Sequence, residues 1–202
     1  EVIVPTPAFG LYEPIINMCR GKYVALDTSE TGFQITKQAL EHAITSRTKA
    51  IVLNSPNNPT GCVYTNQTLD MIHEVLKDKN IFVICDDVYQ QLVYDNNFSS
   101  FMKYQDMRKK LILIQSFAKP YAMTGWRVGY LAADAEIKAQ IEKVHQYMVV
   151  LAVSFIQPAC EQALLYDPSP MVEIYKKRRD YVYSRLVNMG LEVTKPEGAF
   201  YI

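Results

Sequence analysis

Short apolar runs separated by polar stretches set the pattern of this chain. Few of these runs alternate with polar residues, which favours strands covered on both faces, as in a parallel sheet. Pro5 and Pro7 are expected to end the first strand, because proline cannot donate a backbone hydrogen bond. The runs that we interpret as strands are Val2–Val4, Tyr23–Leu26, Ala50–Leu53, Ile81–Cys85, Leu111–Ile114, Val128–Ala132 and Leu191–Val193.

The stretches between these runs carry helix signals. Thr36, Thr65 and Asp134 stand at positions typical of helix N-caps, and Gly21 and Gly190 follow predicted helix ends. The alternation of strand and helix predicts an α/β fold with a mostly parallel sheet and flanking helices. The expected helices cover about 12–19, 36–43, 65–76, 134–148, 153–166 and 171–188.

Composition narrows the class of protein mainly by exclusion. The 202 residues carry 21 basic and 21 acidic side chains, and this balance argues against nucleic acid or an anionic membrane as a partner. No apolar run approaches the roughly 18 residues of a membrane span. The three histidines show no ligand spacing, so we expect no metal site. Without a Cys-x-x-Cys pair, the four cysteines are interpreted as buried thiols in a reducing compartment.

A lysine follows the apolar run Leu111–Ile114 just beyond the predicted carboxyl end of a strand. Ligands of open α/β sheets bind outside these strand ends, so Lys119 is well placed for chemistry. Arg127 comes soon after it, between Gly125 and Gly129, which permit close backbone approach. A lone lysine in such a place is more often a solvated surface residue, so the interpretation depends on what the other strand ends carry.

Other predicted strand ends also carry distinctive residues. Asp86 and Asp87 end a continuously apolar run, where a carboxylate is costly unless it has a partner. The loop Ser55–Gly61 is rich in asparagine and proline and by composition alone is an ordinary turn. Phe9 follows the first strand, where a core phenylalanine is the simplest interpretation.

Taken together, these stretches resemble the fold-type I aminotransferases of class I and II, which use pyridoxal 5′-phosphate. The stretches occur in the family's order along the chain, which makes the match far more specific than a single short motif. The sequence of Tyr121–Arg127 looks most like that of the aspartate and aromatic aminotransferase branch. The motifs that carry the resemblance are Asn58-Pro59-Thr60-Gly61, Asp86-Asp87-Val88-Tyr89, Ser116-Phe117-Ala118-Lys119 and Gly125-Trp126-Arg127-Val128-Gly129.

The resemblance implies three catalytic residues. Lys119 is expected to form a Schiff base with pyridoxal phosphate and to move the substrate's α-proton. Asp86 is expected to pair with the ring nitrogen of the cofactor, in preference to Asp87, for which no direct cofactor contact is implied. Tyr89 is expected to donate its hydroxyl proton to the ring oxygen.

The resemblance also implies the remaining contacts to the cofactor. Asn58 would hydrogen-bond the ring oxygen, and Ser116 and Arg127 would bind the phosphate, Arg127 through a charge-assisted fork. Phe9 would stack on the ring. Ala118 departs from the serine common at this position, which removes one hydroxyl contact.

The expected activity is transfer of an amino group between an L-amino acid and a 2-oxo acid, by a cytoplasmic homodimer in amino acid biosynthesis. Two alternatives remain open: a carbon–sulfur lyase that uses the same cofactor, and a non-enzymatic pyridoxal-phosphate-sensing domain of a transcription regulator. The best boundary, Asp167–Pro170, divides an incomplete cofactor-binding large domain (1–167) from an interdomain helix and the start of a smaller α+β domain (168–202). Both ends interrupt apolar segments, so we expect a truncated chain with low activity of its own.

Overall fold

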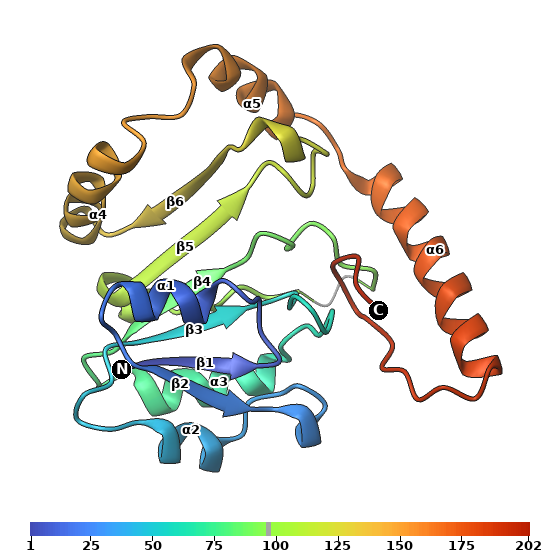
Figure 1. The fold of residues 1–202 in the computed structure, drawn as a ribbon, viewed down its shortest axis with the longest axis horizontal. Helices are drawn as coiled ribbons and strands as arrows, with labels where there is room; N and C mark the ends of the chain where they lie inside the picture. Colours follow the sequence, from blue (N-terminus) through green and yellow to red (C-terminus); the bar gives the residue numbers. More distant parts are fainter. Residues whose placement is uncertain (96–97) are drawn as a thin grey trace.

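A six-stranded sheet forms the centre of the computed structural model, which describes residues 1–95 and 98–202 (Figure 1). The strand order is β2-β1-β3-β4-β5-β6, and the first five strands in the chain pair in parallel. Only β6, at the sheet edge, runs antiparallel to its neighbour β5. The predicted mostly parallel sheet is therefore confirmed. The strands are β1 (Val2–Thr6), β2 (Tyr23–Asp27), β3 (Ala50–Asn54), β4 (Phe82–Asp86), β5 (Leu111–Ser116) and β6 (Gly129–Ala133).

The helices that connect these strands begin where their capping residues predicted. The side-chain oxygens of Thr36, Thr65 and Asp134 each accept a hydrogen bond from a backbone N–H in the first turn that follows. The α-helices are α1 (Tyr12–Met18), α2 (Lys37–Ala43), α3 (Asn66–Leu76), α4 (Ala135–Met148), α5 (Gln157–Leu164) and α6 (Ser169–Asn188). Short 3₁₀ segments cover Ser29–Thr31, Phe101–Lys103, Gln105–Lys110, Thr124–Trp126 and Ser154–Ile156.

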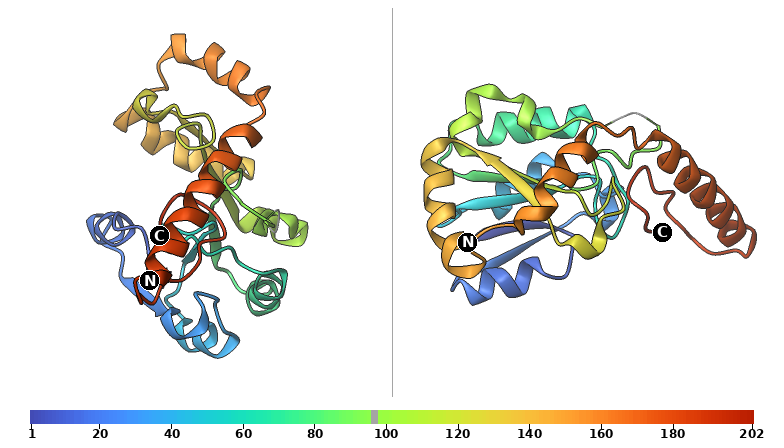
Figure 2. Two further views of the ribbon diagram at one scale, coloured as in Figure 1. Left: turned by 90° about the vertical axis from the view of Figure 1, so that its right-hand side faces the viewer. Right: turned by 90° about the horizontal axis from the view of Figure 1, so that it is seen from above.

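The main hydrophobic core lies between the sheet and helices α2 and α3. Strand residues such as Ile51 and Val83 are fully buried against Leu40 of α2 and Ile72 of α3. Helices α1 and α4 lie on the opposite face of the sheet (Figure 2). The strands are held by packing against α2 and α3 on one face and by backbone hydrogen bonds to neighbouring strands. Their carboxyl ends therefore form a rigid edge for a site.

Pro5 lies inside β1 rather than ending it, so this part of the prediction was wrong. The strand continues to Thr6, and Pro5 is paired in register with Leu26 of β2. On its other side, β1 pairs with β3 only at Val2 and Ile3. The missing N–H of Pro5 therefore removes no bond from that second ladder.

Two predictions near the carboxyl-terminal part were also wrong. Residues Leu191–Val193 form no strand, and Leu191 is exposed, because so short a stretch, with Glu192 at its centre, needs a neighbouring strand to supply backbone hydrogen bonds. The helix expected over 153–166 is shorter, since α5 begins at Gln157 after a 3₁₀ turn. Pro158 explains that start, because proline lacks an N–H and is accepted only in the first helical turn.

The cysteines follow the prediction in three cases of four. Cys62, Cys85 and Cys160 are buried free thiols, whereas Cys19 is exposed at the end of α1, where the prediction of burial was wrong. Helix α1 has no buried residue, so a thiol at its end reaches solvent. Among residues 1–95 and 98–202, no helix combines the length and apolar character needed to cross a membrane.

Candidate active site

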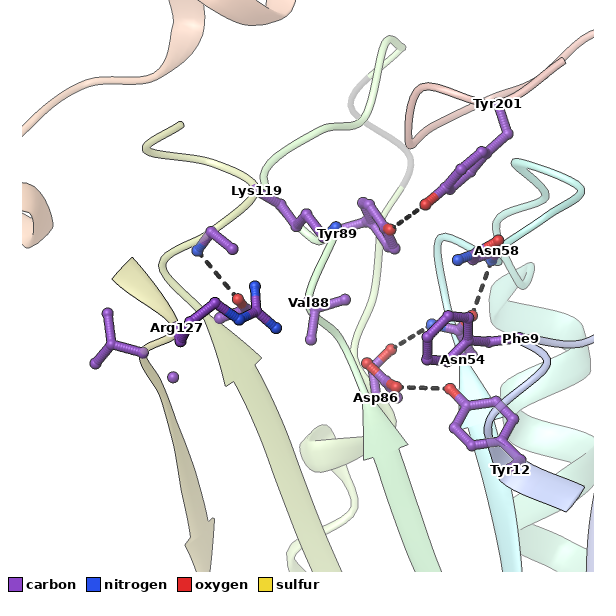
Figure 3. Close-up of a pocket in the computed structure, with 14 residues that line it drawn as sticks. Phe9, Tyr12, Asn54, Asn58, Asp86, Val88, Tyr89, Lys119, Arg127 and Tyr201 are labelled. Atoms are coloured by element: carbon purple, nitrogen blue, oxygen red, sulfur yellow. Dashed lines mark hydrogen bonds between the residues drawn. The ribbon is translucent and has the colours of Figure 1, made fainter. Parts of the chain in front are cut away.

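A cleft of about 390 Å³ opens at the carboxyl ends of β1, β3, β4 and β5 (Figure 3). It includes the point between β1 and β3 where successive connections leave in opposite directions, the usual place for ligands in open α/β sheets. Arg127 joins this edge because β6 is antiparallel and therefore begins where the other strands end. Every predicted site residue lines the cleft: Phe9, Asn58, Asp86, Tyr89, Ser116, Lys119 and Arg127.

Lys119 lies in the turn after β5 and reaches over the cleft beside two aromatic rings. Its Nζ atom is 5.4 Å from the ring centroid of Tyr89 and 5.4 Å from that of Phe200. Both distances suit a cation–π contact. The amine is thus held above the strand ends rather than extended into solvent, which makes it available to a molecule bound in the cleft.

Asp86 is the last residue of β4, and α1 holds its carboxyl group while the end of β3 holds its backbone oxygen. The hydroxyl of Tyr12 donates a hydrogen bond of 2.6 Å to Oδ2. The side chain of Asn54 donates to the backbone oxygen of Asp86 at 2.9 Å and accepts from the backbone N–H of Asn58 at 2.8 Å. Burial raises the pKa of the Asp86 carboxyl, while the hydrogen bond from Tyr12 and the charge of Lys119 lower it.

The two adjacent carboxylates have separate surroundings. Asp87 does not line the cleft, and its Oδ2 accepts a hydrogen bond of 2.5 Å from the hydroxyl of Ser100. Burial raises the pKa of Asp87 to about 7. Of the two carboxylates, only that of Asp86 therefore lines the cleft.

Tyr89 is buried, and its hydroxyl lies 2.6 Å from the hydroxyl of Tyr201. Burial, followed by the hydrogen bond to Tyr201, raises the pKa of Tyr89 well above its usual value. The phenol is therefore neutral at physiological pH. A neutral phenol can donate a hydrogen bond to an anionic oxygen in the cleft.

Ser116 and Arg127 lie together at the β5–β6 side of the cleft. The hydroxyl of Ser116 accepts a hydrogen bond of 3.0 Å from the N–H of Ala118, and Nη1 of Arg127 donates one of 2.8 Å to the carbonyl of Thr124. The backbone of Arg127 has a φ of 52°, in the left-handed region that is uncommon for a side chain of this size. Non-glycine residues in this region cluster at ligand sites, where the surrounding structure holds them in place.

Gly129 lets β6 approach β5 at this point. A Cβ atom there would lie 2.5 Å from the backbone oxygen of Gln115, a distance that no side chain tolerates. The second glycine of the Gly-x-Arg-x-Gly motif is therefore required for the strand pairing that brings Arg127 to the cleft.

Phe9 lies at the other side of the cleft, 40% exposed, with its ring edge-on to that of Tyr12 at 5.8 Å. A phenylalanine with this exposure is not a core residue. It presents ring surface that a flat ligand can cover.

These residues fit pyridoxal phosphate, the cofactor that the sequence resemblance implies. Oδ1 of Asp86 is buried and has no hydrogen-bond partner among residues 1–95 and 98–202, so a hydrogen-bond donor on the ligand would satisfy it. A protonated pyridine nitrogen is such a donor. The hydroxyl of Ser116 and the guanidinium of Arg127 suit a phosphate group, and the amine of Lys119 suits the aldehyde.

Sequence reasoning missed three residues of the cleft. Tyr12, Asn54 and Tyr201 all line it, and each hydrogen-bonds a predicted residue or its loop. Asn54 offered a signal, because an amide that directly follows the buried run Ala50–Leu53 needs a polar partner. Tyr12 and Tyr201 offered none, because their partners lie 74 and 112 residues away in sequence.

Comparisons with known proteins agree with the motifs. The family model described as aminotransferase class I and II matches residues 1–202. A probable N-acetyl-LL-diaminopimelate aminotransferase of Bacillus subtilis is 46% identical over 205 residues, covering 100% of this chain and 52% of that protein. A probable aspartate aminotransferase of Methanocaldococcus jannaschii is 38% identical, covering 100% of this chain and 55% of that protein.

Solved structures show the same similarity. The aspartate aminotransferase of Thermotoga maritima superposes with a TM-score of 0.94 at 35% identity, covering 98% of this chain and 53% of that one. The aromatic aminotransferase of Pyrococcus horikoshii gives a TM-score of 0.93 at 36% identity, with 98% and 55% coverage. This chain spans about half the length of the relatives it matches. The family model, which matches from the first residue to the last, shows that the chain belongs to the class I and II aminotransferases.

Proposed function

We propose that the protein transfers an amino group between an L-amino acid and a 2-oxo acid, using pyridoxal phosphate held in the cleft. The observation that carries this proposal is the unpaired, buried Oδ1 of Asp86, in the same cleft as the amine of Lys119. The names of the relatives, which refer to aspartate, aromatic amino acids and N-acetyl-LL-diaminopimelate, support amino-group transfer.

Bound pyridoxal phosphate supplies an electron-accepting ring that stabilises negative charge on the substrate's α-carbon. The carboxylate of Asp86 keeps the ring nitrogen protonated by accepting its hydrogen bond. Tyr12 holds that carboxylate in place through Oδ2, which leaves Oδ1 for the ligand. The Nζ atom of Lys119 carries the proton that leaves the α-carbon.

The remaining cleft residues bind and orient the cofactor. Ser116 and Arg127 hold the phosphate, which fixes the ring against the strand ends. Asn58 and Tyr89 would hydrogen-bond the ring oxygen, and Phe9 would stack on the ring. The side chain of Asn54 links the backbone N–H of Asn58 to the backbone oxygen of Asp86, which supports a fixed spacing between these two residues.

The assignment of domains extends this proposal. Residues 1–167 form the cofactor-binding large domain, and residues 168–202 supply an interdomain helix and the start of the small domain. The separation of α6 from the sheet supports this division (Figure 1). A homodimer in the cytoplasm with a biosynthetic role also remains a proposal, and three buried free thiols suit a reducing compartment.

An absorbance titration with pyridoxal phosphate tests the role of Lys119. We expect a visible band in the parent protein and none in Lys119→Ala, because no other amine lies in the cleft among its lining residues. Lys138→Ala is the matched control: Lys138 is 60% exposed on α4, and its loss leaves the band unchanged. Reduction with borohydride followed by mass spectrometry identifies the modified lysine. A band in both the parent and Lys119→Ala contradicts the assignment.

Product analysis then tests the reaction itself. With the substrates in the relatives' names as amino donors, we expect the corresponding 2-oxo acid to accumulate only when an acceptor 2-oxo acid is added. Release of ammonia and a thiol from a sulfur amino acid, without any acceptor, would instead favour a carbon–sulfur lyase.

A further inference from the structure

The segment 195–201 returns from α6 and is pinned to loops beside the cleft. Its backbone makes hydrogen bonds with three loop residues, Gly61, Leu92 and Tyr94, and Glu197 adds a side-chain bond to the loop that holds Asn58. The bonds are Gly198 N–H to Gly61 O at 2.9 Å, Ala199 N–H to Leu92 O at 2.8 Å, Tyr94 N–H to Glu197 O at 2.9 Å and Val63 N–H to Glu197 Oε2 at 3.1 Å.

Helix α6 holds the same segment from its other side. Arg179 is almost fully buried, and its Nη1 donates a hydrogen bond of 2.5 Å to the carbonyl of Pro196. Its guanidinium lies over the ring of Tyr94 at 4.6 Å. A charged side chain is buried in this way only where it is paired, so the position of the segment is strongly specified.

This pinning carries Tyr201 into the cleft beside Tyr89. The two hydroxyl oxygens are 2.6 Å apart, and the ring centroids are 5.8 Å apart in an edge-on arrangement. The ring of Phe200 lies 5.5 Å from that of Tyr89, next to Tyr201, and 5.4 Å from the Nζ atom of Lys119. Tyr201 therefore touches the residue that flanks the amine, although the two are 112 residues apart in the chain.

We propose that Tyr201 is a positioning residue of the active site, which orients the hydroxyl of Tyr89 toward the bound cofactor. The inference rests on the proposed function. Two hydroxyls that share one hydrogen bond still have one proton left for a third group. When Tyr201 donates to Tyr89, the proton of Tyr89 is free to point into the cleft.

The short contact between the two hydroxyls also restricts the directions in which the hydroxyl of Tyr89 can point. Without Tyr201, the hydroxyl of Tyr89 loses the partner that lies 2.6 Å away and is less restricted in direction. We therefore expect Tyr201 to act only through Tyr89, which separates positioning from a general effect on folding.

A double-mutant cycle on the full-length protein tests this expectation. Tyr201→Phe, Tyr89→Phe and the double variant are titrated with pyridoxal phosphate, and the pH midpoint of the visible band is measured for each. We expect Tyr201→Phe to weaken cofactor binding about three- to tenfold, which is the range of one hydrogen bond, and to shift the pH midpoint. In the Tyr89→Phe background, the same change has less than about a twofold effect.

Tyr175→Phe is the matched control, because Tyr175 stacks on the same Phe200 at 5.8 Å but does not line the cleft. It leaves both the affinity and the pH midpoint unchanged. The inference is overturned if Tyr201→Phe leaves the cofactor affinity and the pH midpoint unchanged, or if it weakens binding equally in both backgrounds. In either case the visible band of the parent still supports the proposed function. Failure of the parent to give a band that depends on Lys119 would overturn both.

Discussion

Asp86 and Asp87 are neighbours in the chain, yet one faces the cleft and the other is enclosed by protein. Because the side chains of a strand point to alternate faces, the two carboxyls diverge at the end of β4. Asp87 accepts a hydrogen bond from Ser100, but burial outweighs this contact and raises its pKa to about 7. Its carboxyl therefore takes up a proton on folding in mildly acidic solution.

The variant Asp87→Asn tests whether the Asp87 carboxyl takes up a proton on folding. Because the pKa of Asp87 lies near 7 in the folded protein and near 3.8 when unfolded, the folded state binds more protons between those values. Its contribution to the free energy of unfolding thus falls as pH rises through this window, by up to about 1.4 kcal/mol per pH unit. Urea denaturation at several pH values should give a flatter profile for Asp87→Asn than for the parent.

Asp106→Asn is the control for that measurement. Its Oδ2 atom lies 2.7 Å from Nε2 of His73, and the hydrogen bond between them lowers the pKa of Asp106. A lowered pKa contributes stability at neutral pH that is lost as pH falls, so this variant changes the profile in the opposite direction. Parallel profiles for the parent and Asp87→Asn would show that Asp87 is not the group that titrates.

The residues of the cleft were predictable where chemistry lies in a contiguous motif. Asn58, Asp86 and Lys119 each stand in such a motif, and all three line one cleft. Tyr12 and Tyr201 stand in no motif that names their partner, because their hydrogen bonds form only when distant segments pack together. The local sequence pattern predicts which residues lie at the strand ends, but not which residues from distant segments contact them.

At the scale of elements, apolar runs predicted the strands of the sheet well, and the differences arise from pairing. Pro5 is tolerated because β3 pairs with only the first part of β1, and the expected strand 191–193 has no neighbour to pair with. The direction of β6 was also outside the reach of the apolar pattern. That pattern reports burial but not the orientation of a strand relative to its neighbour.

Gly198→Ala tests how firmly the segment 195–201 is fixed to its loops. A Cβ atom at Gly198 would lie 2.6 Å from Cγ of Pro56 and 2.8 Å from the carbonyl oxygen of Leu92. Since neither group can move freely, we expect a loss of about 1–3 kcal/mol in the free energy of unfolding, measured by chemical denaturation.

Gly10→Ala is the matched control, because nothing lies within 4 Å of its added Cβ atom. It should change the stability by less than about 1 kcal/mol. Equal stabilities for the two variants would contradict the tight packing of this segment against the Asn58 loop. A loss of stability in Gly198→Ala accompanied by weaker cofactor binding would agree with Tyr201 being delivered by the segment.

At the scale of the whole molecule, the two sides of the sheet differ in how well they are covered. The side that packs on α2 and α3 is a dense core, whereas α4, α5 and their connection expose large apolar side chains. Tyr147 is 93% exposed, Leu165 80% and Phe155 78%. The edge strand β6 adds exposed Tyr130 and Leu131 beside unpaired backbone groups, a surface that favours further strand pairing.

These surfaces predict that the 202-residue chain associates with itself in solution. Monomeric soluble proteins rarely expose contiguous apolar patches larger than a few hundred Å², because burying such area is favourable by about 25 cal/mol per Å². Sedimentation velocity over a dilution series should show a weight-average mass that rises with concentration. The double variant Phe155→Ser/Leu165→Ser should lower this mass, whereas Met18→Ser, on α1 and outside α4, α5 and their connection, should not.

The sedimentation result also shows whether the exposed side chains of α4 and α5 form an interface. This chain spans about half the length of its relatives, and a longer chain has further segments available to cover α4, α5 and the edge of β6. If association depends on Phe155 and Leu165, these side chains belong to surfaces that are buried in a larger assembly. A chain that stays monomeric at every concentration would show that the exposed side chains are too scattered to form one adhesive surface.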